Sequence, residues 1–516
     1  MNIFFYIIII LFIVGYACIA LEHPLKTNKT ATALILGVAL WTLIALGGEG
    51  TILNPDLYEY FLRYKDGENS FLSWIVGSEL TMHLGSISET LFFLICDMII
   101  VEIMDTYGAF KIITDKIKTT SRVRFLWIIG LLTFVMASIL DNMTSTIVMV
   151  TLLRKIVADK SERWFFASLI VLAANAGGAW SPIGDVTTIM LWVGEKVNTG
   201  TVISTTFLAS LVSFLVPLII LTFTMKGHFS HPQAPISSSE ESKLPLSLGE
   251  RKLVLFMGTF ILLFVIVFKS VTHLPPAIGL LGGLGVMWGI TEILRRRHAG
   301  CDEECRLSVL SIMKKIDLST VLFFLGILLA VAALEVCGHL LLAAEYLEKI
   351  PLAEPEKHFL VNYIIGILSS IVDNVPLVAG AMGIYDFATG HYFWNFLAYC
   401  AGTGGSILII GSAAGVAAMG LEKIDFFWYL KKISWLAFIG YTAGALTFIA
   451  QNYSSIKEKQ MVAQQQEKNM VYIPELPPVG QCGSAQNSRF IFTKFGSQDF
   501  YVSLIDRENI GIERGF

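Results

Sequence analysis

The chain has 516 residues, of which 54% are hydrophobic and 15% are charged, and its mean hydropathy is +0.67. Soluble domains carry about 25% charged residues and are less apolar, so this composition excludes an ordinary soluble domain. Many apolar stretches reach about 18 to 20 residues, the length that a helix needs to cross the hydrocarbon core of a bilayer. The sequence therefore predicts an all-α polytopic membrane protein, with the lipid bilayer as a partner and no nucleic acid.

The first apolar stretch, residues 3–21, could be mistaken for a signal peptide, but no basic residue precedes it. The positive charges follow it, so we interpret it as a spanning helix that enters with its N-terminus outside. The complete set of predicted spans is 3–21, 31–48, 86–106, 164–199 (broken), 202–225, 251–270, 276–293, 318–337, 391–420 (broken) and 425–450.

A further apolar stretch, residues 124–157, is interrupted by Asp141 and Asn142 and is basic on both sides. The loop 107–124 holds five Lys or Arg residues against one acid, and the loop 154–163 holds four against two. Both flanks are therefore expected on the cytoplasmic side. Because each arm has only about 15 residues, which is too short to span, we predict a re-entrant helical hairpin with its turn near Asp141.

The remaining loops orient the other spans by the same rule. The regions 226–252 and 294–315 are rich in Lys and Arg and are expected on the cytoplasmic side, whereas 49–85 and 338–357 are acidic and are expected outside. Threading the spans through these loops gives ten crossings, with both termini outside. This topology predicts a multi-pass protein of the plasma (inner) membrane.

Two segments outside the spans carry little functional signal. Cys301 and Cys305 lie close together in a charged loop, but one such pair without a second is weak evidence for zinc, and we expect solvated thiols and no metal. Residues 454–516 form a polar tail, which we interpret as a loosely ordered extension. A short β-hairpin over the aromatic patch 489–505 is the alternative.

The two halves of the chain resemble each other in three places, in the same order. The offset is 231 residues for the first pair, 232 for the second, measured from Asp141 to Asp373, and 227 for the third, measured from Gly177 to Gly404. Three ordered matches at nearly one offset indicate an internal repeat. The matching segments are 88–108 with 318–338, 137–149 with 369–381, and 173–185 with 400–412.

Each half contains five spans and one hairpin, so the second half enters the membrane from the opposite side. The fold class that follows is a pair of inverted-topology repeats, the architecture of many secondary transporters. The second hairpin, near residues 358–388, should enter from outside, with its turn at Asp373 and Asn374. The predicted layout is a first repeat at 1–225, a cytoplasmic linker at 226–250, a second repeat at 251–453 and the tail at 454–516.

Two of the spans carry residues that break helices. The segment NAGGAWSPIGD places three glycines and Pro182 within eight residues, and AGTGGSILIIGSAAG has a similar set of glycines. Proline removes a backbone donor, glycine favours unwinding, and the carbonyls that are freed must be satisfied by protein or by a watery cavity. Such carbonyls carry partial negative charge and suit Na⁺.

Four polar breaks are thus expected to meet: two hairpin turns and two unwound spans. Sodium is a hard cation that prefers carboxylate, carbonyl and hydroxyl oxygens. The predicted ligands of the transported cation are Asp141, Asn142, Thr144, Asn175, Asp185, Thr187, Thr188, Ser369, Asp373, Asn374 and Ser406.

Structural roles are the alternative for each of these residues. Asp141, Asp373 and Asp185 can instead cap the helices that restart after each break. The two threonines after Asp185 can bond to the preceding turn, and the serines of the second break can serve close helix packing. Charges inside a membrane are usually functional, which favours binding for Asp141 and Asp373.

The acids are not shared equally between the halves. The first half has Asp141 and Asp185 where the second has Asp373 and Ser412, so we expect the cation mainly on the first-half side. Asp97 and Glu102 lie together in the span 86–106. Each is either a buried proton-binding group or a salt-bridge partner.

Three segments resemble the signatures of the NhaD-type sodium/proton antiporters, within the ion transporter superfamily: LDNMTSTIVMVTLLRKIV, VLAANAGGAWSPIGDVTTIMLW and IVDNVPLVAGAMG. The resemblance covers residues 80–450. It implies that the predicted ligands named above, apart from Ser406, take part in transport, and it suggests a homodimer. Sodium-coupled dicarboxylate carriers of the same superfamily have Ser-Asn-Thr hairpin turns, whereas an acid replaces the serine here.

The function predicted from these residues is a secondary antiporter that exchanges Na⁺, together with Li⁺, for H⁺, with no resident cofactor. A carboxylate held away from water binds a proton when no cation is present, and a bound Na⁺ displaces that proton. The alternative is a sodium-coupled anion carrier of the same architecture. A channel is not expected, because a channel does not require inverted repeats with paired hairpins. A membrane-embedded enzyme would need a nucleophile–base pair or a metal site, and the histidines have no ligand spacing.

Overall fold

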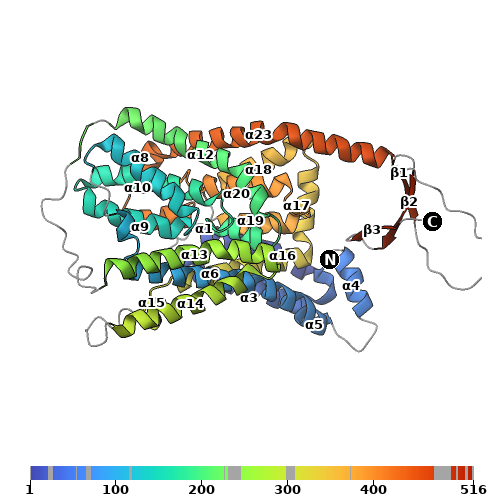
Figure 1. The fold of residues 1–516 in the computed structure, drawn as a ribbon. Helices are drawn as coiled ribbons and strands as arrows, with labels where there is room; N and C mark the ends of the chain where they lie inside the picture. The colour runs from blue at the N-terminus through green and yellow to red at the C-terminus, as the bar shows by residue number, and fades with distance from the viewer. Residues whose placement is uncertain are drawn as a thin grey trace, which may run out of the picture. The chain divides into compact units, whose positions relative to one another are not determined.

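A computed structural model of the chain describes residues 2–20, 27–53, 55–64, 71–114, 119–225, 227–229, 246–297, 308–371, 374–469, 490–495, 498–505 and 509–513. The chain forms two compact units, Met1–Ile449 and Ala450–Phe516. In its described residues the first unit is built from helices (Figure 1). Asp373, Cys301 and Cys305 and most of the predicted linker lie outside the described residues.

Seven long helices correspond to the unbroken spans predicted before residue 340. Five of them, α3, α12, α13, α14 and α16, are long and apolar enough to cross a membrane, and the bent pair α22–α23 gives a sixth among the described residues. The chain is therefore a multi-pass membrane protein, while the full count of ten crossings stays a prediction. The seven helices are α1 (Ile3–Ala20), α3 (Lys29–Gly47), α6 (Thr81–Thr106), α12 (Thr199–Thr224), α13 (Leu248–Thr272), α14 (Pro276–Arg297) and α16 (Leu318–Cys337).

Helices break where the sequence places polar residues, glycine and proline. The two stretches predicted as hairpins form the pairs α8–α9 and α18–α19, and the two spans predicted as broken form α10–α11 and α20–α21. Their bounds are α8 (Arg122–Ala137), α9 (Asn142–Ile156), α10 (Lys160–Gly178), α11 (Val186–Val193), α18 (Glu356–Leu368), α19 (Asn374–Ile384), α20 (Tyr392–Gly404) and α21 (Ala413–Glu422).

Shorter elements connect these helices. The predicted external loop 49–85 is itself helical, and the last predicted span is divided into α22 and α23, which are bent by 53°. The elements are η1 (Gly48–Thr51), α4 (Pro55–Tyr64), α5 (Phe71–Trp74), the π-helix η2 (Ile75–Leu80), α7 (Lys111–Thr114), α15 (Val309–Met313), α17 (His339–Glu348), α22 (Phe426–Lys432) and α23 (Ser434–Asn469).

The C-terminal unit corrects one expectation. Strands β1 (Phe490–Phe495), β2 (Gln498–Ile505) and β3 (Asn509–Glu513) form an antiparallel sheet in the order β1-β2-β3. The prediction of a loosely ordered extension is wrong for these residues, and the alternative of a hairpin over 489–505 agrees with the pairing of β1 and β2. Aromatic and β-branched residues such as Phe490, Ile491 and Val502 favour the paired strands over coil.

Glycines let two long helices approach backbone to backbone. A Cβ atom on Gly37 of α3 would lie 2.7 Å from the Gly326 oxygen of α16, so neither position accepts a side chain without movement. The Trp41 Nε1 donates to the Leu329 oxygen at 2.9 Å across the same interface. In a bilayer, where lipid tails are as apolar as leucine, such close packing is a main source of helix association.

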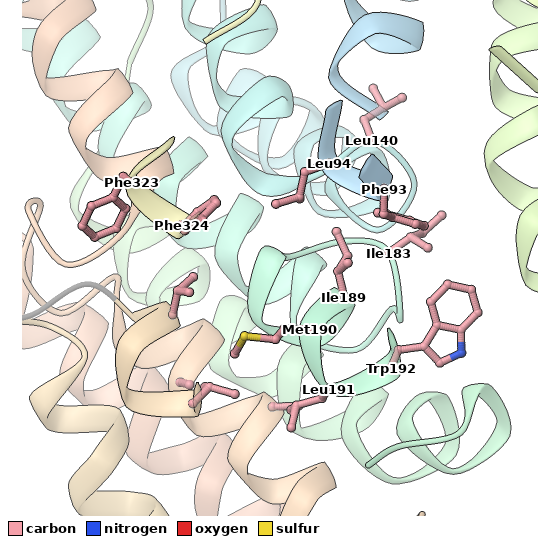
Figure 2. Close-up of a cluster of buried hydrophobic side chains, with 14 of the residues drawn as sticks. Phe93, Leu94, Leu140, Ile183, Ile189, Met190, Leu191, Trp192, Phe323 and Phe324 are labelled. Carbon is pink, nitrogen blue, oxygen red and sulfur yellow. The ribbon is translucent and has the colours of Figure 1, made fainter. Parts of the chain in front are cut away.

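A large apolar core surrounds the breaks. Figure 2 shows side chains from α6, α11 and α16 gathered in one cluster, among them Phe93, Met190 and Phe324. Outward faces are apolar as well: on α13, Phe256 is 67% and Val271 73% exposed in the protein alone. Apolar faces of this kind are expected where a helix meets lipid.

Candidate functional site

The turn of the first predicted hairpin is held by Asp141. Its φ is 99° and its ψ 159°, a conformation that a residue with a side chain rarely adopts. The Thr144 N–H donates to Asp141 Oδ1 at 2.6 Å, and the Thr144 hydroxyl donates to Oδ2 at 2.8 Å. Strain of about 1–3 kcal/mol at such a residue is typical of functional sites.

The first unwound span is organised around Asp185, which is 1% exposed. The Thr187 N–H and hydroxyl donate to Asp185 Oδ1 at 2.9 and 2.8 Å, and Thr188 completes a capping box with the Asp185 backbone. The predicted alternative of a cap is therefore realised for Asp185. Its second oxygen, Oδ2, faces another element and accepts from the Asn142 Nδ2 at 2.7 Å.

Close backbone contacts explain the glycines of both breaks. A Cβ atom on Gly177 would collide with the Phe134 oxygen of α8, and one on Gly404 would collide with the Gly366 oxygen of α18. Each hairpin arm therefore lies against the end of the helix that unwinds. A larger residue at Gly177 or Gly404 would push the hairpin arm away from the helix end that unwinds.

Amide side chains join the breaks into one network. The Asn142 Nδ2 donates to Asp185 Oδ2 at 2.7 Å and to Asn175 Oδ1 at 3.0 Å. The Asn175 Nδ2 in turn donates to the hydroxyls of Ser406 and Ser412, both at 2.8 Å. Residues from three of the four predicted breaks are thus within hydrogen-bond distance of one another.

The fourth break reaches the same centre through Asn374, whose Nδ2 lies 3.4 Å from Asp185 Oδ1. Ser369 does not, because its hydroxyl donates to the backbone oxygens of Gly366 and Ala401. Asp373 lies outside the described residues. The network therefore collects most of the predicted ligands, and Ser369 is not among its members.

A cavity of about 150 Å³ opens beside the network. It is bordered by α6, the start of α9, α11, α16 and the first residue of α21. Asp97 and Asp141 lie in its buried part, and Lys315, whose side chain is 54% exposed, lies at the surface end, 3.5 Å from Glu102. The salt-bridge alternative is thus realised for Glu102.

Sequence reasoning gave Ser412 no place among the predicted ligands and did not consider Asp317 or Lys315. Ser412 is central, because its hydroxyl accepts from Asn175 and from the Gly415 N–H at 3.1 Å. Its alignment with Asp185 in the internal repeat was evident from the sequence, but a small residue there can equally serve close helix packing. The position of Lys315 depends on how α15 meets α6, which no local pattern reveals.

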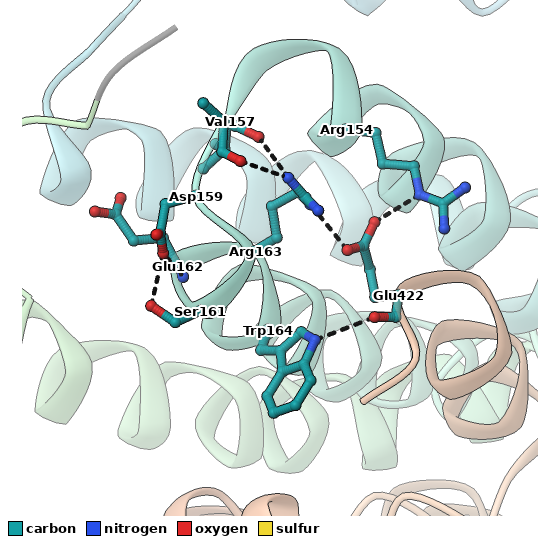
Figure 3. A network of polar contacts seen from close by, with 9 residues as sticks. Arg154, Val157, Asp159, Ser161, Glu162, Arg163, Trp164 and Glu422 are labelled. Atoms are coloured by element: carbon teal, nitrogen blue, oxygen red, sulfur yellow. Dashed lines mark hydrogen bonds and ion pairs between the residues drawn. The ribbon is translucent and has the colours of Figure 1, made fainter. Parts of the chain in front are cut away.

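A buried ion cluster ties the end of α21 to the first hairpin (Figure 3). Glu422 is 3% exposed, and its two carboxylate oxygens accept from Arg154 Nε at 2.7 Å and from Arg163 Nε at 2.9 Å. Arg154 lies on α9 and Arg163 on α10. The cluster therefore joins α9, α10 and α21 at the end remote from the network.

In the loop between α9 and α10, Asp159 caps α10. The Ser161 hydroxyl donates to its carboxylate at 2.6 Å and the Glu162 N–H at 2.8 Å. These hydrogen bonds, the first from Ser161, lower the pKa of Asp159 below its ordinary value. The charge at the start of α10 is thereby kept in the ionised form that favours the helix dipole.

Comparison with known proteins identifies the family. A family model described as citrate transporter (CitMHS) matches residues 7–404. Sodium/proton antiporter 1 of Arabidopsis thaliana is 42% identical over 88% of this chain and 74% of its own length. The chain belongs to the CitMHS family and, within it, to the NhaD-type antiporters. This confirms the resemblance seen in the sequence.

The matches to two further relatives extend over nearly the whole length of those proteins. Sodium/proton antiporter 2 of Arabidopsis thaliana is 41% identical over 86% of this chain and 98% of its own. The Na⁺/H⁺ antiporter NhaD of Vibrio cholerae is 28% identical over 87% of this chain and 92% of its own. Because the relatives are transporters, the prediction that the chain is not an enzyme is confirmed.

Proposed function

We propose that this protein exchanges Na⁺, and also Li⁺, for H⁺ at the network around Asp141 and Asp185. The observation that carries the proposal is the meeting of two carboxylates and three amide side chains at helix breaks inside a membrane protein. Carboxylates in such a place bind protons or cations. The relatives named as sodium/proton antiporters support Na⁺ and H⁺ as the exchanged ions.

We further propose that the two halves are inverted-topology repeats. In the repeat, α6 corresponds to α16, and the preceding long helices α3 and α14 correspond to each other. Their contacts correspond as well, because α3 packs against α16 and α14 packs against α6. The Gly177 contact with Phe134 has its counterpart in the Gly404 contact with Gly366. Related backbone contacts in opposite halves support a two-fold relation.

In the proposed mechanism a proton and Na⁺ compete for the same carboxylates. With neither bound, the negative charges of Asp141 and Asp185 are buried, which is costly. Either a proton or a cation with several oxygen ligands relieves that cost, and the loaded site is then exposed on the other side of the membrane. Coupling follows because the two loads exclude each other.

Reconstituted vesicles test the proposal. With a pH dye inside, adding Na⁺ or Li⁺ to wild-type vesicles should change the internal pH, while K⁺ should not. Asp141→Asn should lower the exchange rate by at least about a hundredfold, because the amide cannot bind a proton and has no negative charge. Wild-type rates in Asp141→Asn would contradict the role of Asp141.

The alternative of a sodium-coupled anion carrier is less favoured. The network in the described residues includes the carboxylate of Asp185, whose negative charge repels an anion. The description of the matched family names citrate, but the curated relatives above are named antiporters. Na⁺-dependent uptake of radiolabelled citrate would favour this alternative. The plasma (inner) membrane and a homodimer remain predictions.

A further inference from the structure

One buried carboxylate borders the cavity without belonging to the network. Asp97 of α6 is 4% exposed and lies in the buried part of the cavity. Among the described residues, no hydrogen bond or ion pair reaches its carboxylate. A carboxylate in this state is costly unless something in the cavity satisfies it.

The other carboxylates of the cavity are supplied with partners. Asp317 caps α16, accepting from the Thr320 N–H at 3.2 Å and from its hydroxyl at 2.5 Å. Glu102 is paired with Lys315 at 3.5 Å. Asp141 accepts both donors of Thr144. Asp97 therefore differs from its neighbours in having its acceptor capacity open to the cavity.

The charges around Asp97 indicate which kind of ligand it would bind. Asp97 lies near enough to Asp141 for the two negative charges to repel each other. Among the described residues that line the cavity, the one cationic side chain is Lys315, which is at the surface end and is shared with Glu102. A small cation between Asp97 and Asp141 would turn this repulsion into two attractions.

We propose that Asp97 and Asp141 form an entry site, which holds a partly hydrated Na⁺ before it reaches the network around Asp185. This proposal rests on the exchange function proposed above. The cavity of about 150 Å³ is several times the roughly 30 Å³ that one water occupies, so it can hold a cation together with some of its waters. Asp97 thereby sets the affinity for the incoming cation.

The test compares Asp97→Asn with Glu89→Gln in full-length protein. Glu89 lies on the same helix, is not among the residues that line the cavity, and undergoes the same change from acid to amide. In vesicles, Asp97→Asn should raise the half-saturating Na⁺ concentration by about tenfold and leave the maximal rate within about twofold, as expected for loss of one charged ligand. Glu89→Gln should change neither.

Binding is measured separately from transport. NaCl, compared with choline chloride, should raise the Tm of the purified wild type and of Glu89→Gln, with the midpoint of this effect shifted to higher Na⁺ in Asp97→Asn. If Asp97→Asn does not fold, Asp97→Glu carries the test. It moves the carboxylate by one methylene and should change the ratio of half-saturating Na⁺ to Li⁺ by about threefold, whereas Glu89→Asp should not.

An unchanged half-saturating Na⁺ concentration in Asp97→Asn, or a loss of maximal rate alone, would overturn the entry site. So would an unchanged Na⁺ to Li⁺ ratio in Asp97→Glu, where that variant carries the test. These results differ from failure of the proposed function, in which wild-type vesicles themselves show no exchange of Na⁺ for H⁺.

Discussion

The two unwound spans have nearly the same backbone but carry different side chains at the same place. Asp185 begins α11 with φ −146° and ψ 144°, and Ser412 begins α21 with φ −145° and ψ 154°. Each side chain accepts a backbone N–H and caps its helix. The difference is the charge: the first half has a carboxylate where the second half has a hydroxyl. Two halves with the same backbone can therefore differ in cation binding, because only one of them carries a charge at this position.

The largest effect is expected when the carboxylate of the first half is replaced by the hydroxyl found in the second half. Asp185→Ser keeps an N-cap, since serine caps as well as aspartate, but removes the charge. Exchange of Na⁺ for H⁺ should fall by about a thousandfold, corresponding to roughly 4 kcal/mol of cation binding. The measurement is the initial rate of the pH change in vesicles.

The control makes the same change at a cap outside the network. Asp425 is exposed and caps α22 by accepting from the Trp428 N–H at 2.8 Å. Asp425→Ser should therefore exchange at the wild-type rate. If Asp185→Ser also did so, the contrast between the two caps would have no functional meaning.

A second contrast lies at the outer ends of the broken spans. Glu422 after the second break is buried between two arginines, whereas Lys196 after the first break lies 3.9 Å from the fully exposed Asp386. Glu422→Gln leaves two arginines without their acid and should cost about 3 kcal/mol of stability. Asp386→Asn should leave the stability nearly unchanged, because an ion pair with a fully exposed partner contributes little.

Thermal unfolding of the purified protein measures both variants. Glu422→Gln should lower the Tm strongly, and Asp386→Asn should leave it nearly unchanged. Equal Tm shifts would mean that the buried Glu422 and the exposed Asp386 stabilise the protein equally, which would contradict the expectation from their burial.

The third test concerns a feature that both halves share, the close contact of a glycine with the neighbouring hairpin arm. Gly177→Ala and Gly404→Ala each force a methyl group against a carbonyl of the neighbouring hairpin arm, so both should lose about 2 kcal/mol. Gly282→Ala, on α14, has no atom within 4 Å of the new methyl group and should not lose stability. Comparison of the three Tm values is the measurement. Unequal losses for the first two variants would show that the scaffold is not shared.

The helix breaks could be predicted from the sequence because their causes are local. Proline and clustered glycines mark the unwound spans, and Asp141 with Asn142 marks a turn. The partners could not be predicted in the same way. Glu422 meets Arg154 and Arg163 across more than 250 positions of the chain, and a single sequence holds no record of that contact.

Among the predicted ligands, those whose position follows from a local helix break were predicted correctly to meet, and one whose orientation depends on packing was not. Asn142, Asn175 and Asp185 meet as expected, because each lies at a break, and breaks converge in this kind of fold. Ser369 turns toward backbone carbonyls instead, which depends on the rotamer it adopts between α18 and α20. Rotamers of short polar side chains follow from packing and not from position in the sequence.

The cap on Asp185 has a consequence for how the amide of Asn142 behaves. Oδ1 of Asp185 accepts from Thr187, so in the proposed mechanism the proton binds at Oδ2, where the Asn142 Nδ2 now donates. A carboxylic O–H donates and needs an acceptor, and a cation likewise needs an oxygen. In either loaded state the Asn142 amide must turn to present its carbonyl. Infrared bands of isotope-labelled asparagine would therefore distinguish the bare carboxylate from both of its loaded forms.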